Sequence, residues 1–184
     1  ALLLVLQLNI QTVYLSFVAV LLASAYPFMK RYTQLPQVVL GAAFSWAIPM
    51  AFMAVNQHVP SWIWWLYAAN LAWTVAYDTQ YAMVDRDDDI KIGVKSTAIL
   101  FGRYDRLIIA LLQAIMLLFL SYVGMLLPLT GWYYLGLIAA AGFMGYQHYL
   151  MRNRAPQHCL RAFLNNNWVG LVIFVGLWLG FLKI

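Results

Sequence analysis

The most informative stretch of the sequence is YDTQYAMVDRDDDIKIGVKST, residues 77–97. It holds five of the six acidic residues of the chain, all of them aspartates, and the sixth follows shortly after it. On a continuous α-helix, Asp78, Asp85 and Asp89 would fall on one narrow stripe, and Tyr81 would border it. Asp85 and Asp89 would lie one turn apart, roughly 6 Å along the axis. Two carboxylates this close repel unless they share a cation, so the spacing predicts a metal site.

The rest of the chain is strongly apolar. Hydrophobic residues make up 65% of the 184 residues and charged residues only 9%, and the mean hydropathy is +0.76. A soluble domain of this composition would have too few polar side chains to cover its surface, so the long apolar runs indicate a polytopic membrane protein. The single cysteine, Cys159, excludes a disulfide framework, and the scattered histidines match no zinc spacing.

Six apolar runs are interpreted as membrane-spanning helices. They cover approximately residues 13–28, 37–55, 62–84, 107–127, 132–150 and 166–184. Pro49 is expected to kink the second run, and the short run 1–8 is expected to be the tail of a helix whose beginning is missing. The fold class is therefore all-α: a polytopic transmembrane helical bundle of six complete helices plus the tail of a seventh. We expect a single domain over residues 1–184.

The basic residues predict how the bundle is oriented. The loops at 29–36, 85–106 and 151–166 hold two, five and three Lys or Arg, the loops at 56–61 and 128–132 hold none, and Lys183 remains. Successive loops lie on alternate sides of a membrane, and the charges alternate as six helices require. By the positive-inside rule, the basic loops and the acidic stretch face the cytoplasm. The net charge of +5 is explained in this way and does not indicate nucleic-acid binding.

Among metals, Mg²⁺ suits the acidic stretch best. Asp85, Asp87 and Asp89 alternate as in an EF-hand, but Ile90 stands where glycine is required and Ser96 where a bidentate glutamate is required. Zinc would lack its nitrogen and sulfur ligands. Paired carboxylates with retained waters suit Mg²⁺, which commonly bridges to substrate phosphates.

Cations follow the carboxylates directly. Arg86, Lys91 and Lys95, together with a turn at Gly93, would place positive charge beside an Mg²⁺-bound anion. Lipid headgroups, or topology alone, explain each of these basic residues equally well. Asp78 lies several residues inside an apolar helix, where a carboxylate costs at least ~2.5 kcal/mol and requires a cavity, a partner or a metal.

The block from Asp78 to Asp89, followed by Lys91 to Thr97, resembles the second aspartate-rich motif of the UbiA-type intramembrane prenyltransferases. The resemblance extends to YPFMKRYT at 26–33, to LPQVVLGAAF at 35–44 and to the asparagines at 165–167. The whole chain can be placed along the C-terminal two thirds of the family. Within the family, it is most similar to the members that prenylate 4-hydroxybenzoate in ubiquinone biosynthesis.

This resemblance implies a helical bundle around a cavity open toward the membrane, in the bacterial inner membrane with the active site toward the cytoplasm. A polyprenyl group would pass from polyprenyl diphosphate to the ring carbon ortho to the hydroxyl of 4-hydroxybenzoate, with Mg²⁺ as cofactor. Exclusion of water would protect the allylic cation. Besides the two substrates, membrane lipid is the expected partner, and nucleic acid is not.

The resemblance also implies residue roles. Asp85 and Asp89 would be the metal ligands and Asp78 a supporting carboxylate, so that these three form the expected catalytic set. The expected substrate-binding residues are Tyr26, Lys30, Tyr81, Arg86, Lys91 and Lys95. Apolar walls around Phe44 and Trp46 would accommodate the isoprenoid tail, although packing explains any single aromatic residue equally well.

The chain departs from the family pattern in one respect. The first aspartate-rich motif of the family should lie upstream, yet no aspartate precedes Asp78. We expect about two and a half helices to be missing and the 184 residues alone to be inactive. Three alternatives stay open: a family member with another acceptor (haem, dihydroxynaphthoate or homogentisate), a membrane cation transporter that uses the acidic stripe as an ion path, and an inactive membrane scaffold.

Overall fold

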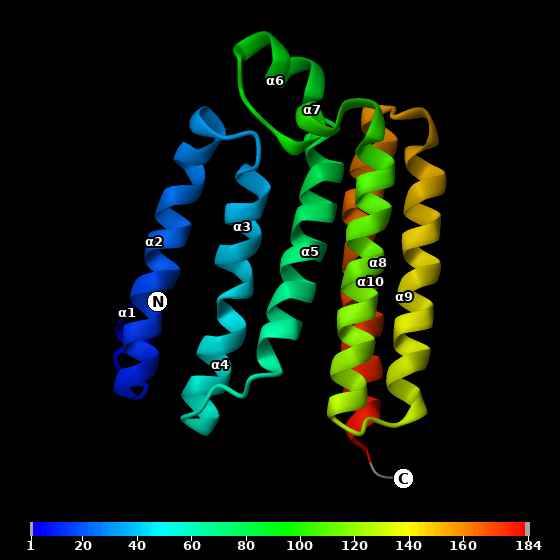
Figure 1. The fold of residues 1–184 in the computed structure, drawn as a ribbon. Helices are drawn as coiled ribbons and strands as arrows, with labels where there is room; N and C mark the ends of the chain where they lie inside the picture. The colour runs from blue at the N-terminus through cyan, green and yellow to red at the C-terminus, as the bar shows by residue number, and fades with distance from the viewer. Residues whose placement is uncertain (1, 183–184) are drawn as a thin grey trace.

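Six membrane-length helical segments run antiparallel in the computed structural model, which describes residues 2–182 (Figure 1). The elements are α1 (Leu2–Val5), α2 (Ile10–Tyr32), α3 (Pro36–Ser45), α4 (Ala47–Asn56), α5 (Ile63–Ala82), α6 (Arg86–Ile92), α7 (Thr97–Phe101), η1 (Gly102–Tyr104), α8 (Asp105–Leu126), α9 (Gly131–Leu150), η2 (Met151–Asn153) and α10 (Pro156–Phe181). No strand occurs within the described residues. The all-α fold class predicted from the sequence is confirmed.

Four of the segments are long and apolar enough to cross a membrane by length and composition alone. They are α2, α3 with α4, α7 with α8, and α10. The two others, α5 and α9, each have 20 residues, which is also long enough to cross a membrane. Several of their polar side chains are turned inward, since Thr79, Gln80 and Gln147 are fully buried. The protein is therefore a multi-pass membrane protein whose interior is partly polar.

The kink expected at Pro49 is a break at Trp46. Trp46 separates α3 from α4, and Pro49 lies in the first turn of α4. Proline has no N–H to donate to the carbonyl of Ser45 and its ring crowds that carbonyl, so the helix is interrupted one turn before the proline. The Trp46 indole N–H donates to the carbonyl of Leu15 at 2.9 Å, which fastens the break to α2.

One end of the bundle carries the basic loops. The end of α2, the connection from α5 to α8 and the connection from α9 to α10 all lie at the end where α6 and α7 sit, at the top of Figure 1. We call it the charged end. The turns at 57–62 and 127–130, which have no Lys, Arg or Asp, lie at the opposite end. This is the alternation that the sequence predicted, although Lys183 lies outside the described residues.

The apolar core lies between α5, α8, α9 and α10. Its buried members are Ala69, Ala72, Met116, Leu120, Tyr133, Leu137, Ala140, Met144 and Val169. Two glycines bring α9 and α10 close together, because a Cβ atom on Gly136 would lie only 2.9 Å from the Cα atom of Gly176. Small residues of this kind let helix backbones pack closely in membranes. On the other side of the molecule, α2 packs against α3 and α4.

Candidate active site

The acidic stretch does not form one continuous helix. Residues 83–85 interrupt it between the end of α5 and the start of α6. The single stripe predicted for Asp78, Asp85 and Asp89 is therefore wrong. Because a new helix begins here, the aspartates at 87–89 lie in its first turn, where the helix dipole stabilises negative charge. An extension of α5 would have placed them near its negative C-terminal end.

The pair Asp85 and Asp89 keeps its spacing across this break. The N–H of Asp89 donates to the carbonyl of Asp85 at 2.8 Å, so the two residues remain one turn apart. Asp85 occupies the N-cap position of α6, but its carboxylate makes no capping hydrogen bond and is available to a ligand. Burial raises the pKa of Asp89, Lys30 opposes this rise, and the neighbouring Asp85 and Asp88 add to it. A bound cation would relieve this crowding of negative charge.

The end of α2 faces these aspartates. Lys30, in the last turn of α2, lies close enough to Asp78 and to Asp89 to interact electrostatically with both. Tyr26 lies one turn earlier on the same helix, within electrostatic range of Asp78. Four of the residues predicted for the site are thus brought together from two distant parts of the chain.

Lys95 joins the α6–α7 connection to the end of α2. Its backbone N–H donates to the carbonyl of Lys30 at 3.1 Å. Its ammonium group lies 3.4 Å from the carbonyl oxygen of Tyr32. Lys95 therefore lies next to the cluster, and its contact with a substrate stays a prediction.

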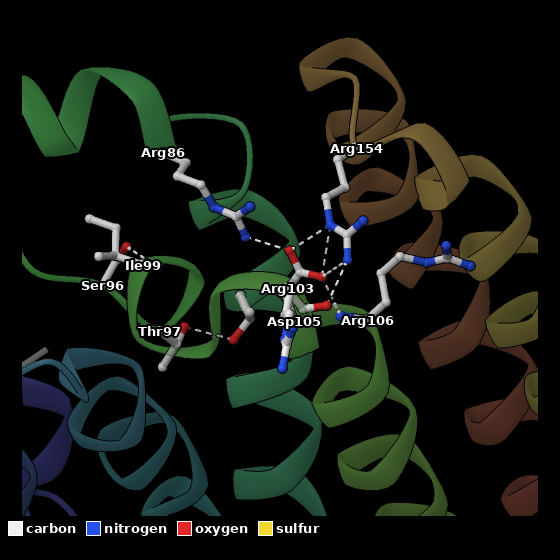
Figure 2. Close-up of polar contacts among 9 residues, drawn as sticks. Arg86, Ser96, Thr97, Ile99, Arg103, Asp105, Arg106 and Arg154 are labelled. Atoms are coloured by element: carbon white, nitrogen blue, oxygen red, sulfur yellow. Dashed lines mark hydrogen bonds and ion pairs between the residues drawn. The ribbon is translucent and has the colours of Figure 1, made fainter.

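Arg86 and Lys91 have other partners. Arg86 forms an ion pair with Asp105, on the side of the acidic stretch that faces α8 (Figure 2). Lys91 pairs with Asp88 at 2.9 Å, where the two side chains are 71% and 81% exposed. This geometry does not bring either residue to the cluster around Lys30, so their contacts with a substrate stay predictions.

Gln37, at the start of α3, is a site residue that the sequence did not indicate. It is 2% exposed and lies beside the carboxylate of Asp78. Its side-chain oxygen accepts the backbone N–H of Thr97 at 3.2 Å. The Thr97 hydroxyl in turn lies 2.7 Å from that of Thr79 on α5. Gln37 stands within the matched stretch LPQVVLGAAF, but no spacing in the sequence connects a lone glutamine with an aspartate 41 residues later.

An aromatic cavity of about 410 Å³ lies deeper along α5. Its lining residues are Phe44, Asn70, Trp73, Tyr77, Phe163, Leu164, Asn166 and Asn167. Tyr77 adjoins Asp78, and Trp73 lies four residues before Tyr77, roughly 6 Å along the helix axis. Tyr81 packs its ring against Phe163, with ring centroids 5.2 Å apart. The volume is in the usual range for a small-molecule site, ~300–1,000 Å³.

A network of amide side chains fixes the inner wall of this cavity. Asn166 accepts the indole N–H of Trp73 at 2.9 Å and donates to Gln80 at 2.8 Å. Gln80 and Gln113 both donate to the side-chain oxygen of Gln147, at 2.9 and 2.8 Å. These bonds connect α5, α8, α9 and α10. Isolated glutamines in apolar helices have no characteristic spacing, so no sequence pattern predicts the network.

Asp105 is the sixth aspartate, and it is completely buried. Its carboxylate accepts hydrogen bonds from Arg86 and from the backbone N–H of Arg106. Arg154 approaches it with two nitrogens, Nε at 3.0 Å from Oδ2 and Nη2 at 2.9 Å from Oδ1 (Figure 2). The hydrogen bond to Asp105 raises the pKa of Arg154. Protein groups therefore satisfy this carboxylate fully.

The donors at the acidic cluster fit Mg²⁺. Among the described residues, no three His, Cys, Asp or Glu side chains lie close enough together to hold a metal ion on their own. Mg²⁺ does not require such a cage, because it typically binds to one or two carboxylates, waters and substrate phosphates. Asp85 and Asp89 provide two carboxylates of this kind.

Comparison with known proteins identifies the family. The sequence matches the UbiA prenyltransferase family over residues 1–180. It is 64% identical over 169 residues to 4-hydroxybenzoate octaprenyltransferase of Chromohalobacter salexigens. The aligned residues make up 92% of this chain and 57% of that protein. It is 59% identical over 181 residues to the protein of the same name from Cronobacter sakazakii. These aligned residues make up 98% of this chain and 62% of the relative. The chain thus spans about three fifths of the length of these curated relatives.

A solved structure shares the fold. The apo structure of a UbiA homolog from Aeropyrum pernix K1 matches with a TM-score of 0.81 at 21% sequence identity. The match covers 97% of this chain and 67% of that chain. The family match over nearly all residues and the high identity to the curated relatives agree with this fold. The chain belongs to the UbiA prenyltransferase family.

Proposed function

We propose that the protein transfers a polyprenyl group from polyprenyl diphosphate to the ring carbon ortho to the hydroxyl of 4-hydroxybenzoate, in ubiquinone biosynthesis. One observation carries this proposal: at the charged end, Lys30 lies within electrostatic range of both Asp78 and Asp89, and an aromatic cavity lies further along α5. The two parts of the site match the two parts of a polyprenyl diphosphate, a charged head and an apolar chain. The names of the curated relatives support the choice of substrates.

The charged residues would bind the diphosphate. Asp85 and Asp89 would hold Mg²⁺, which neutralises charge on the departing diphosphate. Lys30 and Lys95 lie where their ammonium groups can contact diphosphate oxygens, and the Tyr26 hydroxyl can donate a further hydrogen bond. Lys30 also lowers the repulsion between a carboxylate-rich site and its anionic substrate.

The reaction breaks the bond between the allylic carbon and the diphosphate oxygen, and the electron pair leaves with the diphosphate. The ring carbon of 4-hydroxybenzoate supplies the electrons of the new carbon–carbon bond, and loss of its proton restores aromaticity. The rings of Phe44, Trp73 and Tyr77 would line the prenyl chain and keep water from the allylic cation. Their faces can also stabilise a positive charge.

We infer a location in the bacterial inner membrane, and the basic loops support an orientation with the charged end toward the cytoplasm. The water-soluble acceptor, 4-hydroxybenzoate, and Mg²⁺ would then reach the site from the cytoplasm. The isoprenoid tail would approach from the bilayer. The mixed character of the site, charged at the end of the bundle and aromatic further inside, agrees with this arrangement.

The test is transfer of a radiolabelled polyprenyl group to 4-hydroxybenzoate in membranes. The protein assayed is a chimera in which this chain replaces the matching stretch of the Chromohalobacter relative, beside the unmodified relative and the 184-residue chain alone. We expect the chimera to form product with Mg²⁺ and to lose activity when the metal is chelated. A folded chimera that is inactive beside an active relative would contradict the proposal. If product forms with homogentisate or dihydroxynaphthoate in place of 4-hydroxybenzoate, the protein has another acceptor.

A further inference from the structure

The helix that carries the acidic pair is not held by apolar packing. None of the side chains of α6 is buried, and it sits above the bundle in Figure 1. Two polar connections tie its ends to the rest of the molecule. At its start, Arg86 pairs with Asp105, and beyond its end the N–H of Lys95 donates to the carbonyl of Lys30 at 3.1 Å.

The anchor at the start of α6 is itself firmly held. Asp105 is 0% exposed and begins α8, which packs along α5. Arg154 and the backbone N–H of Arg106 bind the same carboxylate, so Asp105 keeps its place independently of Arg86 (Figure 2). The Arg86 side chain is 21% exposed, which protects its ion pair from screening by solvent.

We propose that Asp105 is a positioning residue for the metal-binding pair, acting through Arg86. Asp85 directly precedes Arg86, and Asp89 is bonded one turn later to the carbonyl of Asp85. Fixing the Arg86 side chain on Asp105 therefore fixes the backbone that carries both carboxylates, next to α5. The inference rests on the proposed function, because it is the metal site of that enzyme that Asp105 positions.

A matched pair of substitutions tests this inference. Arg86→Gln and Arg154→Gln each remove one guanidinium from Asp105, but only Arg86 belongs to α6. In the chimera, without substrate, we measure Mn²⁺ affinity by electron paramagnetic resonance and hydrogen exchange over residues 86–94. We expect R86Q to weaken Mn²⁺ binding about tenfold, as loss of a residue that orients a ligand does, and to speed exchange in this segment.

The control variants are expected to behave differently. R154Q should lower the unfolding temperature and leave Mn²⁺ affinity within about twofold, because Arg86 still holds α6 to Asp105. Arg86→Lys, which keeps the charge, should recover most of the affinity. In steady-state assays of prenyl transfer, R86Q should raise the Mg²⁺ concentration that gives half the maximal rate. This increase should be a larger factor than the decrease in the rate at saturating Mg²⁺.

Several results would overturn the inference. These are unchanged exchange over residues 86–94 in R86Q, equal losses of Mn²⁺ affinity in R86Q and R154Q, or weakened binding of polyprenyl diphosphate in R86Q at unchanged Mn²⁺ affinity. The last result would make Arg86 a substrate ligand. If R86Q shows the expected changes but the unmodified chimera transfers no prenyl group, the positioning role stands and the proposed function fails.

Discussion

Two sets of aspartates share the charged end, and they differ in how their charge is met. Asp105 is completely buried, and two arginines and a backbone N–H satisfy its carboxylate. Asp85 and Asp89 are partly exposed, and the ion pairs found among the described residues involve Asp88 and Asp105 but neither of these two. Charge that the protein itself neutralises holds the fold together. Charge that it leaves in excess marks the place where a cationic ligand is expected.

The largest effect is expected where charge is left in excess. Asp89→Asn should lower Mg²⁺-dependent prenyl transfer by at least about 100-fold, as loss of one charge-stabilising group in an active site does. The free energy of unfolding should change by no more than about 0.5 kcal/mol, because none of the ion pairs among the described residues involves this carboxylate and its attraction to Lys30 is partly screened by solvent. Transfer assays and denaturant titrations of the same membrane preparation check both values.

The opposite pattern is expected at Asp105. Asp105→Asn should lower the free energy of unfolding by about 3 kcal/mol, because it breaks a buried ion pair. This value is at the lower end of the range for such pairs, since both arginines are partly exposed. Asp105→Glu, which retains the charge, is the control and should lose less. Unfolding titrations in detergent measure the change. A loss for Asp105→Asn no larger than that for Asp89→Asn would remove the distinction between the two sets.

A neutral buried network should show a smaller effect. Gln147→Leu leaves the amide groups of Gln80 and Gln113 without their acceptor and should cost about 2 kcal/mol of unfolding free energy. A cost below about 0.5 kcal/mol for the leucine variant would mean that the network is replaced by other contacts.

The smallest effect is expected at Lys91. Its ion pair with Asp88 is largely exposed, so Lys91→Gln should leave both activity and stability unchanged. Lys30→Gln is the matched comparison, since Lys30 faces Asp78 and Asp89, and it should lower transfer about tenfold. If Lys91→Gln lowers transfer as strongly as Lys30→Gln, Lys91 contacts the diphosphate in the bound state, as the family resemblance implies.

The helices and their alternation could be predicted because both depend on local properties. Apolar length defines a span, and the positions of Lys and Arg define the sides, so neither requires knowledge of tertiary contacts. The break at residues 83–85 could not be predicted from the aspartate spacing, which an unbroken helix satisfies equally well. The break places the aspartates in the first turn of α6, where the helix dipole favours them, and this can be recognised only once the ends of α5 and α6 are known.

Within the site, the sequence indicated which residues are present but not which partners they have. The family resemblance named Tyr26 and Lys30, and the structure brings both to Asp78. The pairing of Arg86 with Asp105 joins residues 19 apart across α6, α7 and η1, three short helices with no shared periodicity, so no sequence pattern predicts it. Gln37 reaches Asp78 only through packing of α3 against α5.

The most direct test of the acidic pair is a titration with Mn²⁺ in the presence of inorganic diphosphate, followed by electron paramagnetic resonance. The chimera should bind Mn²⁺ saturably, and both Asp85→Asn and Asp89→Asn should weaken that binding by at least about tenfold while the protein stays folded. Unchanged affinity in either variant would contradict the assignment of Asp85 and Asp89 as the metal ligands.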